Sequence, residues 1–504
     1  MFRRLIVPTS RRPRLPVAAF SRTRPTYSTE EGRPSKEQIN ATAIQHQLSG
    51  HAETAFRTMA RFGKAAVIAS VLAGLTIFGS FEFAHQYVEH RSLRPEPDEG
   101  IKRFEWDVSD ELYHGDPMVG GTDPGLGRGG RQAVRSAWMS QHWGVESPEL
   151  GLSSIGSAVD APILYAVAYL ERALTLTENP DVHPLTRAEL HNRAGSLLER
   201  LGNSRTADAR AHFEQAWQGF SGEGLRAARV GLKLGDVSAR MGRNGEALYW
   251  WKKSIQLCEG PTSSVGPLLE PEEVPTSPWA QRIIASALVS ISAFYAQHGK
   301  LADAQKFEES SLSLLRSIPT PESISTASPP QALHALFLLQ RSSLLSVHLA
   351  EVLHAQKQPV LASIQYLSLA ASSSERVARA LSDLPVQQGP GQLHETPIPQ
   401  GEDQISPVYS ASKTLSPVAS RLYRDAKRTA AEAWNLLGIL YEKHEGRSSK
   451  TALLCYERAI QWAGKKGEGD EGVSIANEAA TEADWNVFYA NFQRAKEASS
   501  QKNK

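Results

Sequence analysis

The sequence predicts an all-α protein, a solenoid of helical hairpins preceded by a single transmembrane helix. From about residue 160 onward, apolar residues recur at helical spacing and no alternating strand pattern appears. A pattern of small and bulky residues repeats along the same region, and one uncharged, mostly apolar run lies near the N-terminus. The 504 residues carry 55 Lys+Arg against 54 Asp+Glu and are 22% charged, which excludes general disorder and a polybasic nucleic-acid-binding protein.

Residues 1–28 have the composition of a mitochondrial presequence. Seven arginines and no acidic residue occur before Glu30, together with several Ser and Thr residues. We expect this segment to be cleaved near Ser28. The alternative is a disordered basic tail that binds anionic surfaces.

Residues 64–88 are expected to form the transmembrane helix. The seventeen uncharged positions from Ala65 to Phe81 would extend about 26 Å at a rise of 1.5 Å per residue, which is short for a span but is lengthened by the apolar residues that follow. The mean hydropathy of the whole chain is −0.35, which excludes a protein with many spans but permits one. A buried core helix is the alternative interpretation.

Charges on either side of the apolar run predict its orientation. Three basic residues precede the run and two acidic residues follow it: Arg57, Arg61, Lys64, Glu82 and Glu89. Flanking segments rich in Lys and Arg tend to stay on the inner side of the membrane, so residues 29–63 are expected in the matrix. The domain after the span would then face the intermembrane space, and the opposite orientation would place it in the matrix.

Residues 89–159 are expected to be a linker and lead-in, because the part up to Gly130 is rich in proline, glycine and acidic residues. A glycine cluster, Gly125–Gly130, is not a phosphate-binding loop, since no strand precedes it and no Lys-Ser or Lys-Thr pair follows. Trp138 and Trp143 lie ahead of the repeats and have no packing position in the pattern.

Five segments of the chain share one packing pattern. A small residue late in one helix is followed, after a turn, by a small residue, a bulky residue four positions later and a third position three beyond that. The copies are Gly195 with Ala209, Phe213 and Ala216; Gly235 with Ala247, Trp251 and Ser254; Ser292 with Ala304, Glu308 and Ser311; Ala350 with Ala362, Tyr366 and Leu369; and Gly438 with Ala452, Tyr456 and Ala459. Two antiparallel helices approach closely only where side chains are small, so each copy predicts one hairpin.

The last copy resembles a tetratricopeptide (TPR) repeat. Its signature is Trp434, Leu437, Gly438, Tyr441, Ala452, Tyr456 and Ala459. The resemblance covers residues 160–465 and implies a solenoid that binds extended or helical protein segments in the groove formed by the first helix of each pair. The alternative is an irregular helical bundle.

Four loop insertions interrupt the expected array, and a capping helix ends it. The loops are 259–278, 318–330, 384–407 and 464–472. Residues 466–504 are expected to form an acidic loop, a capping helix over 479–496 and a basic frayed tail.

The sequence predicts no catalytic, cofactor-binding or metal-binding residues. The histidines are scattered, no Cys-x-x-Cys or Gly-x-Ser-x-Gly motif occurs in the helical array, and Cys258 and Cys455 are expected to be small buried residues. Glu308 and Glu309 are expected on a solvated helix face. The only Lys-x-x-x-Asn motif singled out, Lys36 to Asn40, precedes the span, so binding of chaperone tails is unsupported.

The order of presequence, single span and repeat domain resembles the fungal adaptor subunits of the mitochondrial i-AAA protease supercomplex. That resemblance implies a non-enzymatic protein of the inner membrane that delivers unfolded or misassembled proteins to the protease. It also implies protein partners and neither nucleic acid nor a small-molecule substrate. The alternative is an assembly factor or scaffold for a respiratory-chain complex. An outer-membrane import receptor is disfavoured, because such receptors usually begin with their anchor. The residues that bind clients cannot be read from the sequence.

Overall fold

The computed structural model describes residues 36–109, 112–116, 119–143, 161–260, 271, 274–382, 384, 405–447, 449–464 and 482–502. The chain divides into two compact units, Met1–Ser80 and Phe81–Lys504. The expected presequence, residues 1–28, lies outside the described residues, as does most of three of the four expected loops. The fourth loop is described and is irregular between residues 319 and 328.

Helix α1, Lys36–Tyr87, begins well before the expected span and includes all but the last residue of it. The stretch Gly50–Ser92 is long and apolar enough to cross a membrane, with a mean hydropathy of 1.8 in its most apolar window, none of which is buried. Helix α11, Pro329–Ala355, also meets this test at a mean hydropathy of 1.2, but 61% of its window is buried in the array. Burial identifies α11 as a core helix and leaves α1 as the better candidate for a membrane span.

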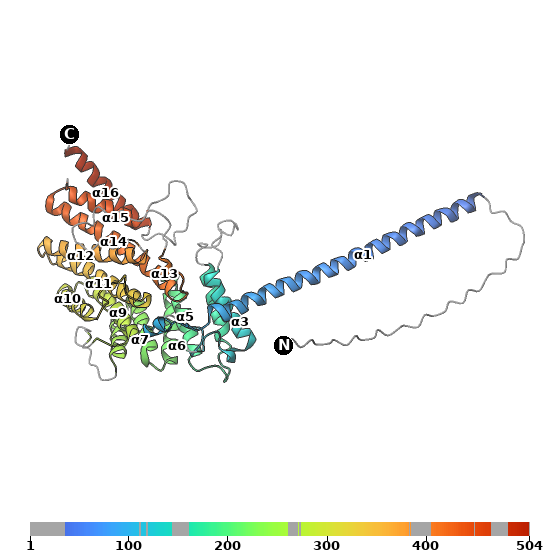
Figure 1. Cartoon of the computed structure of the whole chain (residues 1–504), viewed down its shortest axis with the longest axis horizontal. Coiled ribbons are helices and arrows are strands. Elements are labelled where there is room, and N and C mark those ends of the chain that lie inside the picture. The colour runs from blue at the N-terminus through green and yellow to red at the C-terminus, as the bar shows by residue number, and fades with distance from the viewer. Residues whose placement is uncertain are drawn as a thin grey trace, which may run out of the picture. The chain divides into compact units, whose positions relative to one another are not determined.

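The second unit consists of helical hairpins that follow one another along the chain (Figure 1). Its helices are α2 (Glu99–Arg103), α3 (Gly127–His142), α4 (Ala161–Leu174), α5 (Thr186–Arg200), α6 (Thr206–Gly219), α7 (Gly224–Arg240), α8 (Asn244–Glu259), α9 (Pro278–Gln297), α10 (Leu301–Ser317), α11 (Pro329–Ala355), α12 (Val360–Leu381), α13 (Pro407–Ser410), α14 (Leu415–Glu445), α15 (Lys450–Ala463) and α16 (Glu482–Lys502). The hairpins pair α3 with α4, α5 with α6, α7 with α8, α9 with α10, α11 with α12 and α14 with α15, and α16 packs on α15. No strand occurs among the described residues, so the predicted all-α, TPR-like fold is confirmed.

Local sequence explains where several helices begin and end. Ser277 accepts a hydrogen bond from the backbone N–H of Ala280 and Pro278 occupies the first turn, so α9 starts with a capped end. Ser449 caps α15 in the same way. Gly242 (φ 72°) and Gly299 (φ 69°) adopt the left-handed conformation in two hairpin turns, which favours glycine at both positions.

Three of the five small residues are glycines that lie against an aromatic ring. The pairs are Gly195 with Phe213, Gly235 with Trp251, and Gly438 with Tyr456. A Cβ atom at Gly235 would lie 2.3 Å from the indole, and one at Gly438 would lie 2.5 Å from the phenol ring. The two helices of each hairpin therefore touch where one has no side chain.

The α11–α12 hairpin packs one residue later than the sequence pattern suggests. Ala350 is buried, but Ala362 and Tyr366 are half-buried and Leu369 is 43% exposed. The residues one position later, Ser363, Leu367 and Ala370, are buried instead. The connection Gln356–Pro359 is one residue longer than Met241–Arg243 between α7 and α8, which moves the contact face along by one position.

The α9–α10 hairpin places a carboxyl group in the core, contrary to the expected solvated face. Glu308 is 0% exposed, whereas Glu309 is exposed. The hydroxyl of Ser292 donates a hydrogen bond of 2.6 Å to Glu308 Oε1, so the small and bulky positions of this copy are joined by a polar contact. Burial raises the pKa of Glu308 to about 8.

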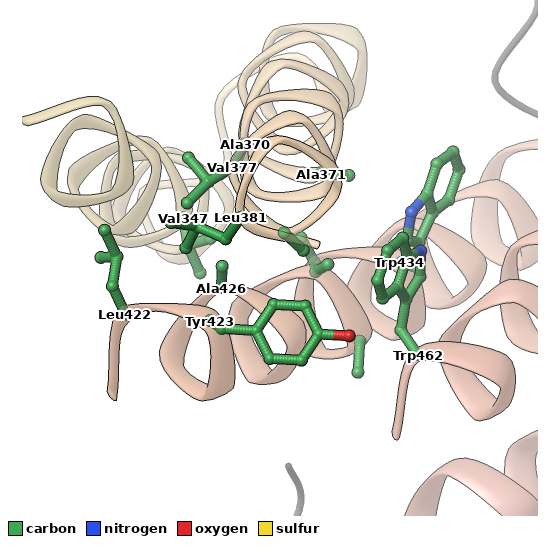
Figure 2. Close-up of a cluster of buried hydrophobic side chains, with 14 of the residues drawn as sticks. Val347, Ala370, Ala371, Val377, Leu381, Leu422, Tyr423, Ala426, Trp434 and Trp462 are labelled. Carbon is green, nitrogen blue, oxygen red and sulfur yellow. The ribbon is translucent and has the colours of Figure 1, made fainter. Parts of the chain in front are cut away.

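Glu375 of α12 holds the last hairpin together from inside the core. Its carboxylate accepts hydrogen bonds from the indoles of Trp434 (2.6 Å) and Trp462 (2.7 Å) and from two nitrogens of Arg458 (2.6 Å each). Figure 2 shows the two indoles side by side within the buried cluster around α12, α14 and α15. Trp434, the tryptophan of the TPR signature, thus packs in the core and also donates a hydrogen bond to the preceding hairpin.

Candidate functional site

The residues between α1 and α3 are packed against the array and do not form a free linker. We call residues 93–109, 112–116 and 119–126 the strap. Four of its apolar side chains are buried: Ile101, Trp106, Tyr113 and Leu126. The strap therefore belongs to the core of the second unit.

The strap contacts one edge of the array, which we call the rim. The rim consists of the N-terminal ends of α5, α7, α9, α11 and α14, including the residues that cap them. These are the first helices of five consecutive hairpins. Each of the five contributes at least one hydrogen bond to the strap or accepts one from it.

Arg282 of α9 is the centre of this contact. Its guanidinium donates to the carbonyl oxygens of Phe104 and Glu105, both at 3.0 Å, and lies 3.7 Å from the ring centroid of Trp106. The indole N–H of Trp106 donates to the carbonyl of Pro330 at the start of α11, at 2.9 Å. One arginine thus fixes both the main chain and an aromatic side chain of the strap.

Acidic side chains of the strap meet the ends of first helices. Glu105 Oε2 accepts from the hydroxyl of Ser277 (2.5 Å) and from the backbone N–H of Trp279 (2.9 Å) at the start of α9. Asp123 accepts from the hydroxyl of Thr186, the first residue of α5. The N-terminus of a helix carries free N–H groups and a partial positive charge, so carboxylates are stabilised there.

Main-chain atoms of the strap bind to side chains of α5 and α7. The N–H of Gly115 donates to the hydroxyl of Thr186 at 3.0 Å, and the N–H of Leu112 donates to Glu189 at 3.4 Å. Arg226 donates to the carbonyl of Gly115 at 2.9 Å and pairs with Glu189 at 3.1 Å. These contacts recognise a peptide backbone and depend little on the strap's side chains.

A second aromatic residue of the strap lies under a second arginine. The guanidinium of Arg193, on α5, is 4.0 Å from the ring centroid of Tyr113. Together with the pair of Arg282 and Trp106, this gives two cation–π contacts that attach the strap at separate hairpins.

Burial lowers the pKa of two basic residues at the site, Arg282 and His334. It lowers the pKa of Arg282 to about 9, although the neighbouring Glu105 opposes this shift. It also lowers the pKa of His334 to about 3, to which the nearby Arg282 contributes. His334 is therefore neutral; its Nδ1 accepts from Arg282 at 3.3 Å and its Nε2 donates to Gln281 at 2.9 Å.

The packing residues named from the sequence are not on the rim, and most of them are buried inside the hairpins, with Ala362, Tyr366 and Tyr441 only half-buried. Sequence reasoning missed the residues that hold the strap, because it treated the strap as a linker. Glu105 and Trp106 were the available signal, an acidic residue and a bulky aromatic residue side by side in a stretch otherwise rich in loop-forming residues. Trp138 is half-buried and stacks on His142 with centroids 4.2 Å apart, whereas Trp143 is 45% exposed.

Within the described part of the chain, no group of three or more His, Cys, Asp or Glu side chains is placed to hold a metal ion. Cys258 and Cys455 are both buried free thiols. Burial raises the pKa of each, which disfavours the reactive thiolate.

No protein-family model matches the sequence, and neither does any curated protein. A search of solved structures finds similarity to a monomeric mutant of IFIT1 with m7Gppp-AAAA. The match has 13% sequence identity and a TM-score of 0.21, and it covers 73% of this chain and 80% of that chain.

Proposed function

We propose that the protein is a membrane-anchored scaffold that binds extended polypeptide segments along the inner side of its TPR-like array. One observation carries this proposal. The rim already holds an irregular segment of the protein's own chain, through hydrogen bonds to main-chain N–H and C=O groups and through arginine contacts to aromatic rings. Side chains arranged in this way suit polypeptides of varied sequence.

We further propose that the protein works in the mitochondrial inner membrane as a non-enzymatic adaptor. In this scheme the N-terminus lies in the matrix, and the array, in the intermembrane space, passes unfolded or misassembled proteins to the i-AAA protease. The proposed parts are a presequence (1–28), a matrix segment (29–63), a span (64–88), a lead-in (89–159), the TPR-like array (160–465) and a C-terminal loop, cap and tail (466–504). The apolar helix and the arginine-rich N-terminus support this arrangement.

Anchoring explains how weak contacts would suffice. An adaptor and a protease confined to the same membrane meet at a raised effective concentration, so each groove contact can be weak and short-lived. Weak contacts to main-chain atoms also allow a client to move on to the protease.

The experiment places a photo-crosslinking amino acid in the full-length protein in mitochondria. Ser286 lies one turn beyond Arg282 on α9, and Lys252 is exposed on α8, the second helix of its hairpin. Crosslinks to unfolded membrane proteins are expected from position 286 and not from 252. Equal crosslinking at both positions, or none at 286, would contradict binding along the first helices.

Mild solubilisation and co-purification test the adaptor role. The i-AAA protease should co-purify, and deletion of the adaptor should prolong the lifetime of the protease's clients. If client lifetimes are unchanged while one respiratory complex fails to accumulate, the assembly-factor alternative replaces the adaptor.

A further inference from the structure

A cavity of about 940 Å³ opens between the strap, helix α3 and the chain around α13 and the start of α14. Its lining brings together residues of the first part of the second unit, between Tyr87 and His142, and residues between 410 and 418. Tyr87, at the end of α1, and Trp138, on α3, are part of the wall.

Three basic residues line the same cavity: Arg91, Arg94 and Lys413. Neither arginine makes an ion pair or a side-chain hydrogen bond with any described residue. The ammonium of Lys413 donates a hydrogen bond to the main-chain carbonyl of Arg94, so the chain just before α14 contacts the strap here. Burial lowers the pKa of Lys413, and the charges of Arg94 and Arg91 lower it further while Glu96 opposes them, so the three cations are crowded.

Acidic residues also line the cavity, but local contacts engage most of them. Glu96 accepts from the hydroxyl of Thr414, and Asp98 accepts from the backbone N–H of Gly100 at 2.7 Å. Burial raises the pKa of Asp107, which reduces its tendency to carry charge. Arg91 and Arg94 are the first two charged residues of the lining after α1, so the charge of the lining next to α1 is positive, whereas its four carboxyl groups lie further along the strap.

The chain places these cations close to the expected end of the membrane span. Arg91 follows residue 88, the last residue of that span, by three positions, or about 5 Å along a helix. The head-group layer of each leaflet is of similar thickness, about 5 to 8 Å. Tyr87 lies 6.0 Å from Trp143, and Trp138 lies 5.5 Å from Trp143, between ring centroids. Amphipathic aromatic residues are enriched at this depth of a membrane.

We propose that this cavity binds the phosphate head group of an anionic phospholipid through Arg91, Arg94 and Lys413. Two free guanidiniums can each form paired hydrogen bonds with phosphate oxygens, and an ammonium supplies a third positive charge. Tyr87 and Trp138 then contact the glycerol region of the same lipid. The site rests on the proposed span, and it gives the array a second attachment to the membrane.

The test reconstitutes the full-length protein in nanodiscs of phosphatidylcholine with a minor fraction of phosphatidylglycerol. Native mass spectrometry counts the phosphatidylglycerol retained after the disc is removed. One retained molecule per chain is expected for the unsubstituted protein. Lys413→Gln should weaken retention about tenfold and Arg91→Gln with Arg94→Gln more strongly, because charge-assisted hydrogen bonds are lost. Circular dichroism verifies that each variant is folded.

Arg128→Gln is the matched control, because Arg128 lies on α3, is 71% exposed and does not line the cavity. It should retain phosphatidylglycerol normally. Equal loss in the control and the cavity variants would indicate general surface charge and overturn the site, as would full retention in the cavity variants. A further arm adds inorganic phosphate to pure phosphatidylcholine discs. If phosphate binds there with the same dependence on Lys413, the ligand is a soluble phosphate and not a lipid. Failure of the chain to enter any disc would refute the span itself and is distinguishable from these outcomes.

Discussion

Replacing Glu308 by glutamine should change how the protein's stability depends on pH. The folded protein raises the pKa of Glu308 from 4.5 to about 8, mainly because the side chain is buried. The nearby carboxylates of Glu351 and Glu309 add to this shift, and the hydrogen bond from Ser292 opposes it. His348 Nδ1 lies 2.9 Å from the same Ser292 hydroxyl, and burial lowers its pKa to about 4, so it adds no positive charge near neutral pH.

The sign follows from proton uptake. Between pH 4.5 and about 8 the folded state holds a proton on Glu308 that the unfolded state has lost, so the free energy of unfolding falls as pH rises through this window. A change of one unit in pKa corresponds to about 1.4 kcal/mol. The rise of about 3.5 in the pKa of Glu308 therefore limits the fall in the free energy of unfolding to about 5 kcal/mol. Relaxation around the charge reduces this, and we expect about 2 kcal/mol.

Glutamine keeps the shape and the acceptor for Ser292 but never ionises. The Glu308→Gln protein should therefore match the unsubstituted protein near pH 4.5 and exceed its stability by about 2 kcal/mol near pH 9. Chemical unfolding of the full-length protein in detergent between these pH values measures the difference. Glu309→Gln, on the exposed side of the same helix, should change the pH dependence far less, because the charge of Glu309 makes only a small contribution to the raised pKa of Glu308. A Glu308→Gln protein that is less stable at pH 9, or that keeps the original slope, would refute the assignment.

Three other substitutions test the packing and the strap. Glu375→Gln should lower the free energy of unfolding by about 3 to 5 kcal/mol, because it leaves Arg458 buried without its counter-charge; urea unfolding measures this. Gly235→Ala should cost about 1 to 3 kcal/mol, because the new methyl group would lie 2.3 Å from an indole, whereas Gly245→Ala, which meets nothing within 4 Å, should be neutral or stabilising. Arg282→Lys should speed amide hydrogen exchange in the strap, because lysine cannot bind two carbonyls and stack on an indole together; unchanged exchange would show that the strap is held elsewhere.

The hairpins could be predicted because their contacts are short in sequence and repeat. Gly438 and Tyr456 lie on adjacent helices, and the same small-to-bulky relation recurs in other hairpins. The chemistry at each position is less predictable. The pattern placed Glu308 at a bulky position, but only the structure shows that a serine hydroxyl and a raised pKa allow a carboxyl group to be buried there.

The strap could not be predicted, because its contacts are long-range and follow no period. Glu105 binds Ser277, which is 172 residues away, and Trp106 binds Pro330, which is 224 residues away. Proline, glycine and acidic residues are typical of loops, and here the acidic residues are instead used to bind helix ends. Composition therefore predicted loops but gave no information on whether that part of the chain is packed.

Long-range contacts also change how the array behaves as a whole. In an ordinary solenoid each hairpin contacts only its neighbours, so hairpins at the ends can unfold first. The strap adds hydrogen bonds to α5 through Asp123, to α9 through Glu105 and to α14 through Glu96, which are separated from one another by at least one hairpin. If any one of these hairpins unfolded, part of the strap would be released and Trp106 or its neighbours would be exposed to water. The contacts of the strap with the other hairpins would then be weakened as well. The strap therefore couples hairpins that the solenoid alone would leave independent.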